Sequence, residues 1–98
     1  LILIGCSKDK TIKTDCIESM LKQKNMIQYT GQEIGCKFYL ELYHYQNKQY
    51  FLLNNNCADI VSYPIDCDGN SFCEDGNEYK CRDFYANAQK IGIIGIEK

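Results

Sequence analysis

Cysteine is the residue type best able to do chemistry in this chain, which contains seven cysteines among 98 residues. Their spacing bears on metal binding, because zinc knuckles place two cysteines three positions apart and often add histidine. No two cysteines here have that spacing, and His44 is the only histidine. Free thiols at this density are unusual in the cytosol. The pattern therefore predicts disulfides formed in an oxidising compartment, and we expect no metal and no cofactor.

The first cysteine follows a short apolar run at the amino terminus. Leu3-Ile4-Gly5-Cys6 resembles the lipobox of bacterial lipoproteins, in which a small residue precedes the cysteine that signal peptidase exposes and that then carries lipid. The resemblance implies that residues 1–6 are the remnant of a signal peptide with its lipobox cysteine and that residues 7–13 are a polar tether. Cys6 would then attach the protein to a membrane. The alternative is a buried first strand in which Cys6 pairs with another cysteine.

Setting Cys6 aside leaves an even number of cysteines. We expect these six to form disulfides with one another: Cys16, Cys36, Cys57, Cys67, Cys73 and Cys81. Six cysteines allow many pairings, and their spacing does not choose among them. A chain of this length buries only a small core, so each disulfide is expected to add about 2 to 4 kcal/mol to a modest stability.

Catalytic chemistry has little support in the sequence, because acid–base or nucleophilic catalysis needs converging polar side chains. His44 has the inner-face parity of a predicted strand, with no obvious nucleophile beside it, so we expect a structural histidine and no enzyme. Asp66, Asp68 and Asn70 surround Gly69 like the ligands of a calcium loop. The EF-hand pattern, however, places its glycine later and ends with glutamate. An ordinary Asp-Gly turn is the favoured interpretation.

Composition limits the classes of partner. Hydrophobic residues make up 45% of the chain and charged residues 24%, which is typical of a chain that packs a core. Eleven Lys and Arg against thirteen Asp and Glu give a net charge of -2, so the basic excess of nucleic-acid-binding proteins is missing. The length fits one domain. We place this disulfide-rich domain at residues 14–98, because no repeat or linker divides them.

A helix is predicted at the start of that domain. Apolar residues at helical spacing, together with a capping box formed by Asp15 and Glu18, predict a helix over residues 15–25. Two glycines then break the chain. Residues 26–35 are therefore expected to be irregular or to carry a short extended piece.

A hairpin is predicted over residues 36–57, because apolar residues alternate there with a period of two. A turn at residues 47–48 would place Leu42 opposite Leu53. The apolar side chains that would share the inner face are Phe38, Leu40, Leu42, Phe51 and Leu53.

The outer face of this hairpin gathers tyrosines. They are Tyr39, Tyr43, Tyr45 and Tyr50, with Tyr45 opposite Tyr50. Tyrosine offers a large contact area with few rotors to freeze, so these residues form a possible interaction surface. The alternative is that cross-strand aromatic pairs stabilise the sheet or that a second layer covers this face.

The remaining segments complete an α+β fold. Strand-like residues 60–65, an Asp-Gly turn and residues 70–73 predict a second hairpin, and residues 74–83 are predicted to be loop. Isoleucines that alternate with glycine predict a last strand over residues 89–97. We therefore expect one N-terminal helix packed on a small antiparallel sheet of about four to five strands, stabilised by disulfides.

Cysteine-centred motifs follow one another in a definite order along the domain. After the tyrosine-rich hairpin come Asn56-Cys57-Ala58-Asp59, the segment from Tyr63 to Cys73, and Cys81-Arg82-Asp83-Phe84. Together with Cys16 on the helix, this order is similar to that of small cysteine-rich lipoproteins of Bacteroidetes, whose domain has no assigned function. The resemblance covers residues 16–84 and implies an envelope lipoprotein, although Ala58 stands where a second vicinal cysteine is common. Because the resemblance does not account for Cys36 and Cys67, we expect these two to pair.

Two functions are compatible with these expectations. The first is a non-catalytic, envelope-anchored lipoprotein that binds an unknown protein or glycan through its tyrosine face or its loops. The second is a small disulfide-clamped inhibitor of an extracytoplasmic hydrolase, which would present residues 74–80 between Cys73 and Cys81. An exposed aromatic face favours the first, and a rigid loop between bridged cysteines favours the second. Both place the protein in the cell envelope, held by lipid at the periplasmic face or the cell surface.

Overall fold

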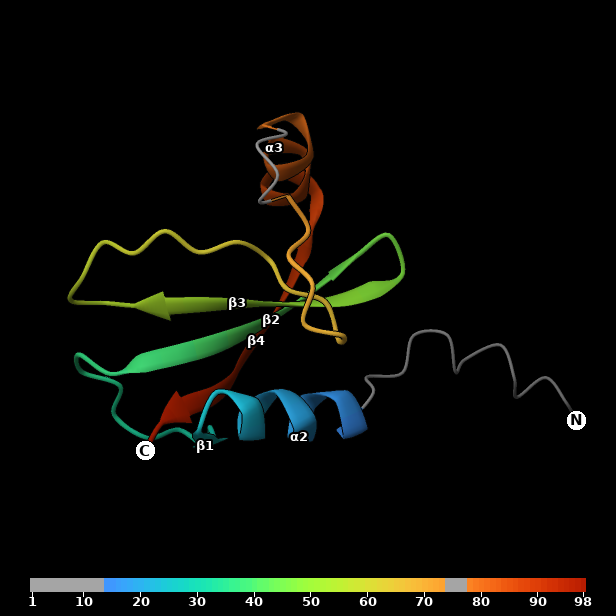
Figure 1. Ribbon diagram of the computed structural model, residues 1–98. Coiled ribbons are helices and arrows are strands. Elements are labelled where there is room, and N and C mark those ends of the chain that lie inside the picture. Colours follow the sequence, from blue (N-terminus) through green and yellow to red (C-terminus); the bar gives the residue numbers. More distant parts are fainter. Residues whose placement is uncertain (1–13, 74–77) are drawn as a thin grey trace, which may run out of the picture.

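The computed structural model describes residues 14–73 and 78–98 of the chain. Within them the elements follow in the order α2 (Thr14–Gln23), β1 (Met26–Gln28), β2 (Phe38–Tyr45), β3 (Lys48–Asn55), α3 (Glu78–Asn87) and β4 (Gln89–Glu97). The strands form one antiparallel sheet in the order β1-β4-β2-β3. Figure 1 shows α2 and α3 on opposite sides of this sheet. The predicted disulfide-stabilised α+β fold is confirmed, with a second helix added.

Helix α2 confirms the predicted helix over residues 15–25, although it ends slightly earlier. Asn25 has a φ of 58°, the left-handed conformation that commonly ends a helix. The buried face of α2 carries Met20 and Leu21, which pack on the inner face of the β2–β3 hairpin and form the main core. The other buried members of this core are Met26, Leu40, Leu42 and Phe51.

The β2–β3 hairpin has the predicted inner face but a different turn. Tyr45 pairs with Lys48, so the turn lies one residue earlier than predicted. Its two residues, Gln46 and Asn47, have φ values of 51° and 65°, as a type I′ turn requires. The predicted register is therefore wrong by two residues. Because side chains alternate with a period of two, this shift leaves every side chain on its predicted face.

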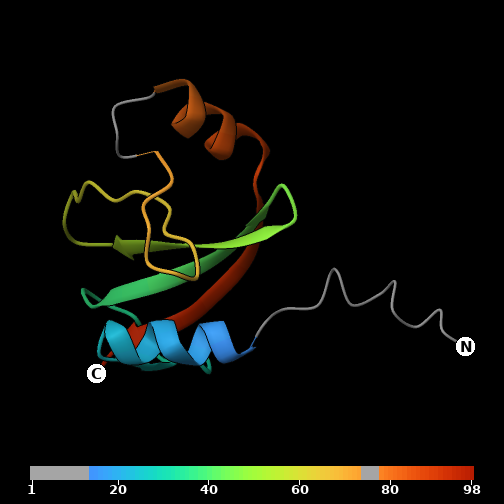
Figure 2. The same ribbon diagram turned by 45° about the vertical axis from the view of Figure 1, so that its right-hand side comes forward.

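Strand β4 confirms the predicted last strand, and it lies inside the sheet between β1 and β2. Figure 2 shows β4 as a long, curved strand that runs from the end of α3 to the side covered by α2. Its pairing with β2 shifts register beside Glu41 and again beside Tyr43. Such bulges bend a strand. Near its far end, Gly95 lies against Leu21 of α2, where a Cβ would collide with the leucine side chain.

Helix α3 corrects the loop prediction over residues 78–83, and the rest of that prediction, residues 74–77, lies outside the described residues. Among the described side chains of this helix, Phe84 is the one that is fully buried. A helix that buries so little carries almost no apolar periodicity, so the sequence pattern does not reveal it. The expectation of a single helix was wrong for this reason.

The predicted second hairpin is reduced to a turn and two bridges. Gly69 has a φ of 87°, a conformation that glycine adopts readily, so the Asp-Gly turn forms as predicted. Ile65 pairs with Phe51 on one side and with Ser71 on the other. The preceding residue, Pro64, has no N–H to continue the ladder. Phe72 donates its N–H to the carbonyl oxygen of Pro64 at 2.8 Å and receives no bond in return, so the pairing on the Ser71 side stops there.

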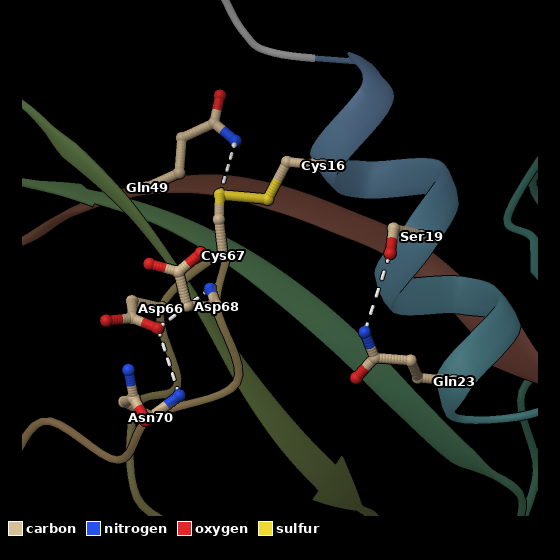
Figure 3. The surroundings of a disulfide bond; sticks show 8 residues. All are labelled: Cys16, Ser19, Gln23, Gln49, Asp66, Cys67, Asp68 and Asn70. Atoms are coloured by element: carbon tan, nitrogen blue, oxygen red, sulfur yellow. Dashed lines mark hydrogen bonds between the residues drawn. A yellow bond between two sulfur atoms is a disulfide. The ribbon is translucent and has the colours of Figure 1, made fainter.

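Three disulfides join these elements. They are Cys16–Cys67, Cys36–Cys57 and Cys73–Cys81. The first ties α2 to the Asp-Gly turn (Figure 3), the second closes the open end of the β2–β3 hairpin, and the third fastens α3 to the segment before it. The predicted pairing of Cys36 with Cys67 is wrong. Phe38 and Asn55 are paired across the hairpin, so Cys36 and Cys57 meet just beyond them, with Cα atoms 5.1 Å apart.

Candidate interaction surface

The outer face of the β2–β3 hairpin is divided into a covered half and an open half. In the covered half, Tyr45 is 6% exposed and Tyr50 is 5% exposed. Their ring centroids lie 5.1 and 5.5 Å from that of Phe84 in α3, and both rings also contact Phe72. The prediction that Tyr45 and Tyr50 face a partner is therefore wrong, because α3 forms a second layer over them.

The open half keeps the other two predicted tyrosines, Tyr39 and Tyr43, which are both half-buried. The Tyr39 hydroxyl donates to Asn56 Oδ1 at 3.1 Å. The Tyr43 hydroxyl donates to Glu41 Oε1 at 3.4 Å. Since each hydroxyl is bound within the protein, the orientation of each ring is restricted before any partner arrives.

Glu41 lies at the centre of the open half, although it is only 4% exposed. Lys90 Nζ lies 2.6 Å from Glu41 Oε2, and Asn54 Nδ2 donates to Glu41 Oε1. A carboxylate with so little access to water needs such partners to remain charged. Glu41 and Lys90 therefore balance each other's charge, and this group of side chains carries no net charge.

The same contacts change the protonation of Lys90 and Tyr43. The hydrogen bond to Glu41, followed by the negative charge of Glu41, raises the pKa of Lys90. Burial, followed by the charge of Glu41, raises the pKa of the Tyr43 hydroxyl. Both groups stay protonated near neutral pH, so neither is suited to act as a general base there.

Outside the covered half, a third tyrosine with a bound hydroxyl comes from α3. Tyr85 is 54% exposed, and its hydroxyl donates to the carbonyl oxygen of Ser62 at 3.3 Å. It lies close enough to Tyr43 to contribute to the raised pKa of that residue. Tyr85 was missed in the sequence because the start of its helix was predicted to be loop. Tyr39, Tyr43 and Tyr85 are called the anchored tyrosines below.

His44 and Asp66, which the sequence also offered as candidates for chemistry, make contacts that belong to the fold. His44 is half-buried and pairs with Gln49 across the hairpin. Asp66 Oδ1 accepts the backbone N–H groups of Asp68 and Asn70 at 2.9 and 3.0 Å, so this carboxylate stabilises the turn (Figure 3). In the part of the chain that the structure describes, no three His, Cys, Asp or Glu side chains gather as metal ligands.

The disulfides bear on location. Three of them in one small domain are typical of proteins that fold in an oxidising, extracytoplasmic compartment. Over residues 14–73 and 78–98, no helix has the length and apolar character needed to cross a membrane. The predicted signal-peptide remnant, the lipid-bearing Cys6 and the polar tether lie outside the described residues.

The fold and the anchored tyrosines define a small disulfide-bonded α+β domain with restricted aromatic rings near an ion pair, in which Glu41 is buried and Lys90 is exposed. The chain belongs to the family described as Domain of unknown function (DUF6970), whose model matches residues 36–95. No curated protein and no solved structure matches the chain. The matched residues include all three anchored tyrosines, whereas α2, with its Cys16, lies outside them.

Proposed function

We propose that the protein is a non-catalytic lipoprotein of the cell envelope that binds a protein or a glycan through the anchored tyrosines. The observation that carries this proposal is that all three hydroxyls are bound within the protein: Tyr39 to Asn56, Tyr43 to Glu41, and Tyr85 to Ser62. Rings that are already restricted lose little conformational freedom on binding. Tyrosine also combines a large apolar ring with few rotors, which suits a recognition surface.

The polar groups around these rings support recognition over catalysis. Glu41 is occupied by Lys90 and Asn54, so its carboxylate is not placed to take a proton from a substrate. The ion pair instead fixes the side chains between the rings. A surface of this kind offers shape and fixed hydrogen-bonding groups, which are the properties of a binding module.

Cys6 supplies the attachment to the membrane in this proposal. Leu3-Ile4-Gly5-Cys6 resembles a lipobox, and the motif order is similar to that of Bacteroidetes lipoproteins. Several acyl chains, with each buried methylene contributing about 0.8 kcal/mol, would hold the protein firmly. Intact-mass measurement of envelope material should show an acyl adduct on the native protein that is lost in Cys6→Ser. An unmodified native Cys6 would contradict the anchor.

Affinity capture from the native envelope tests the binding role. The baits are the lipid-bearing native protein and its Tyr39→Ala, Tyr43→Ala and Tyr79→Ala variants. Mass spectrometry identifies the retained proteins and sugars. Tyr79 is the matched control, because its ring is 78% exposed and contacts Arg82 instead of a hydroxyl acceptor. We expect a partner that Tyr79→Ala retains and that Tyr39→Ala and Tyr43→Ala lose by about tenfold. Equal retention by all four baits would contradict the proposal.

One observation favours the second candidate, an inhibitor of an extracytoplasmic hydrolase. The Cys73–Cys81 disulfide joins the two ends of residues 74–80, the segment that an inhibitor would present. Inhibition assays on envelope hydrolases distinguish the two functions. Inhibition that Lys80→Ala weakens and Tyr39→Ala leaves unchanged would support the inhibitor, and the absence of inhibition would exclude it.

A further inference from the structure

The three disulfides differ in their exposure to solvent. Cys36 and Cys57 are both exposed, at the open end of the β2–β3 hairpin. Cys73 is 2% exposed, and Cys16 and Cys67 pack, partly buried, against the main core. Thiol–disulfide exchange requires a thiolate to reach a sulfur of the bridge. Cys36–Cys57 is therefore the bridge that a dissolved thiol reaches most easily.

Asn55 holds the backbone of both exposed cysteines. Its Nδ2 donates to the carbonyl oxygen of Cys36 at 3.0 Å, and its Oδ1 accepts the N–H of Cys57 at 2.8 Å. These two hydrogen bonds do not involve the sulfur atoms, so they can persist when the disulfide is reduced. The two thiols would then stay near each other, which favours rapid re-formation of the bridge.

The same bridge lies next to one anchored tyrosine. Asn56, which accepts the Tyr39 hydroxyl, directly precedes Cys57 in the chain. The disulfide restricts Cys57 and therefore also the turn that carries Asn56. Reduction removes the covalent restraint on this turn and leaves the two Asn55 hydrogen bonds, so the Tyr39 ring is held less firmly. Tyr43 and Tyr85, which are bound elsewhere, keep their positions.

We propose that Cys36–Cys57 is a site of reversible thiol–disulfide exchange that sets how firmly Tyr39 is held. The co-reactant is a dithiol reductant. One of its thiolates attacks one cysteine sulfur and displaces the other as a thiolate, and its second thiolate then resolves the mixed disulfide. The protein gains two electrons and two protons, and the reductant leaves as its own disulfide. The exchange itself is argued only from the exposure of the three disulfides, whereas its effect on binding rests on the proposed function.

Dithiothreitol is the probe for selectivity. The native protein is incubated with it in the absence of denaturant, free thiols are alkylated, and the modified peptides are mapped by mass spectrometry. We expect Cys36 and Cys57 to be alkylated on the order of ten times faster than Cys73 and Cys81, while the circular dichroism stays native. Alkylation of all three pairs at one rate, or of Cys16 and Cys67 first, would overturn the proposal.

Asn55→Ala tests the reversibility. The reductant is then removed and oxidised glutathione is added, whose disulfide takes up the two electrons and two protons and leaves as two molecules of glutathione. Under these conditions the native protein should re-form the bridge severalfold faster than Asn55→Ala. Asn55→Asp keeps the acceptor for Cys57 and should recover part of that rate. Asn70→Ala removes an exposed asparagine from the Asp-Gly turn and should behave as the native protein does. Equal rates for native protein and Asn55→Ala would overturn the reversible character of the site.

Aromatic NMR signals separate this inference from the proposed function. Reduction should shift or broaden the ring signals of Tyr39, identified through Tyr39→Phe, and leave those of the covered Tyr45 unchanged. An unchanged Tyr39 signal would overturn the proposal that this disulfide sets how firmly the Tyr39 ring is held. If the ring responds but Tyr39→Ala retains the captured partner, the proposed function fails and the redox site stands. If Tyr39→Ala loses the partner but reduction does not weaken binding, the redox control fails and the proposed function stands.

Discussion

At the scale of single residues, Tyr45 connects the covered half of the hairpin to α3. Its hydroxyl donates to Asp83 Oδ2. This hydrogen bond, with a smaller effect of burial, raises the pKa of Tyr45 from 10.0 to about 12. The ring of Phe84, the residue after Asp83, packs against the rings of both Tyr45 and Tyr50. This hydrogen bond and the Phe84 ring therefore hold α3 over the sheet, in addition to the Cys73–Cys81 disulfide and the bond from Tyr85 to Ser62.

The raised pKa of Tyr45 predicts a loss of stability at alkaline pH. The folded state holds this proton more tightly than the unfolded chain, whose tyrosines ionise near pH 10. The contribution is therefore fully present below about pH 10 and is lost as the pH rises towards the folded pKa of about 12. Urea unfolding over this range should show a shallower fall of stability in Tyr45→Phe than in the native protein. Tyr43, Tyr50 and Tyr85 also have raised pKa values, so part of the fall remains. Identical slopes would contradict the prediction.

Gly95 gives a second test at the scale of one residue. Its backbone passes so close to the Leu21 side chain that a Cβ would overlap the leucine Cδ2 atom. Leu21 is 9% exposed and has little room to move, so Gly95→Ala should lower the free energy of unfolding by about 1 to 3 kcal/mol. In a double-mutant cycle, Gly95→Ala should cost much less when Leu21 is already alanine. A cost that does not depend on Leu21 would place the strain elsewhere.

At the scale of elements, the hairpin shows what a sequence pattern predicts and where it stops. Alternation with a period of two assigns each side chain to a face, and those faces are confirmed. The pattern does not set the register, which depends on the two turn residues. Both must adopt positive φ, and Gln46 is an unusual residue for that conformation. The wrong register also hid the disulfide, because only the observed one places Cys36 opposite Cys57.

Helix α3 explains the missed half of the candidate site. It buries Phe84 deeply and exposes most of its other described side chains, so it lacks the apolar stripe by which helices are recognised. Without this helix, the sequence does not indicate that Phe84 covers Tyr45 and Tyr50 or that Tyr85 lies near Tyr43. Long-range packing, which a local pattern does not encode, therefore decides which tyrosines remain accessible.

Because α2 covers the inner face of the hairpin and Phe84 of α3 also contacts Tyr43 at the edge of the open half, aspartate should be damaging on either side, to different degrees. Leu40 is 0% exposed, so Leu40→Asp buries an unpaired charge and should abolish folding. Tyr43→Asp loses the ring contact with Phe84, at 5.5 Å, and places a second carboxylate beside Glu41. It should lower the free energy of unfolding by about 2 to 3 kcal/mol in urea titrations. Val61 is the control, because its side chain is 85% exposed. Val61→Asp should change the free energy of unfolding by less than about 0.5 kcal/mol. A fully stable Tyr43→Asp would show that the contact between Tyr43 and Phe84 contributes little to stability.

At the scale of the whole molecule, one segment connects the layers. Ile65 pairs with Phe51 on β3, so the chain at this point covers the outer edge of the sheet. Two residues later, Cys67 is bonded to α2 on one side of the sheet. Further along, Cys73 is bonded to α3, which lies on the other side (Figure 1). Both helices are thus fastened to the same edge segment.

These connections predict an order of importance for the disulfides. A bridge stabilises the folded state chiefly by restricting the unfolded chain, and the effect grows with the length of chain that it encloses. The sequence separations are 51 for Cys16–Cys67, 21 for Cys36–Cys57 and 8 for Cys73–Cys81. Replacing each pair by alanine should therefore cost about 4, about 3 and about 2.5 kcal/mol in that order.

The measurement is urea unfolding of the three double-alanine variants in a Cys6→Ser background, which prevents mispairing through the extra thiol. The Cys16–Cys67 variant should be the least stable, because α2 supplies Met20 and Leu21 to the main core and depends on this bridge for a covalent link to the edge segment. Loss of Cys36–Cys57 should leave a cooperatively folded domain, since that bridge encloses a hairpin already held by its own ladder. If removing Cys73–Cys81 proved the most damaging instead, chain restriction would not be the main effect. The fastening of α3 over Tyr45 and Tyr50 would then be the contact on which the domain depends.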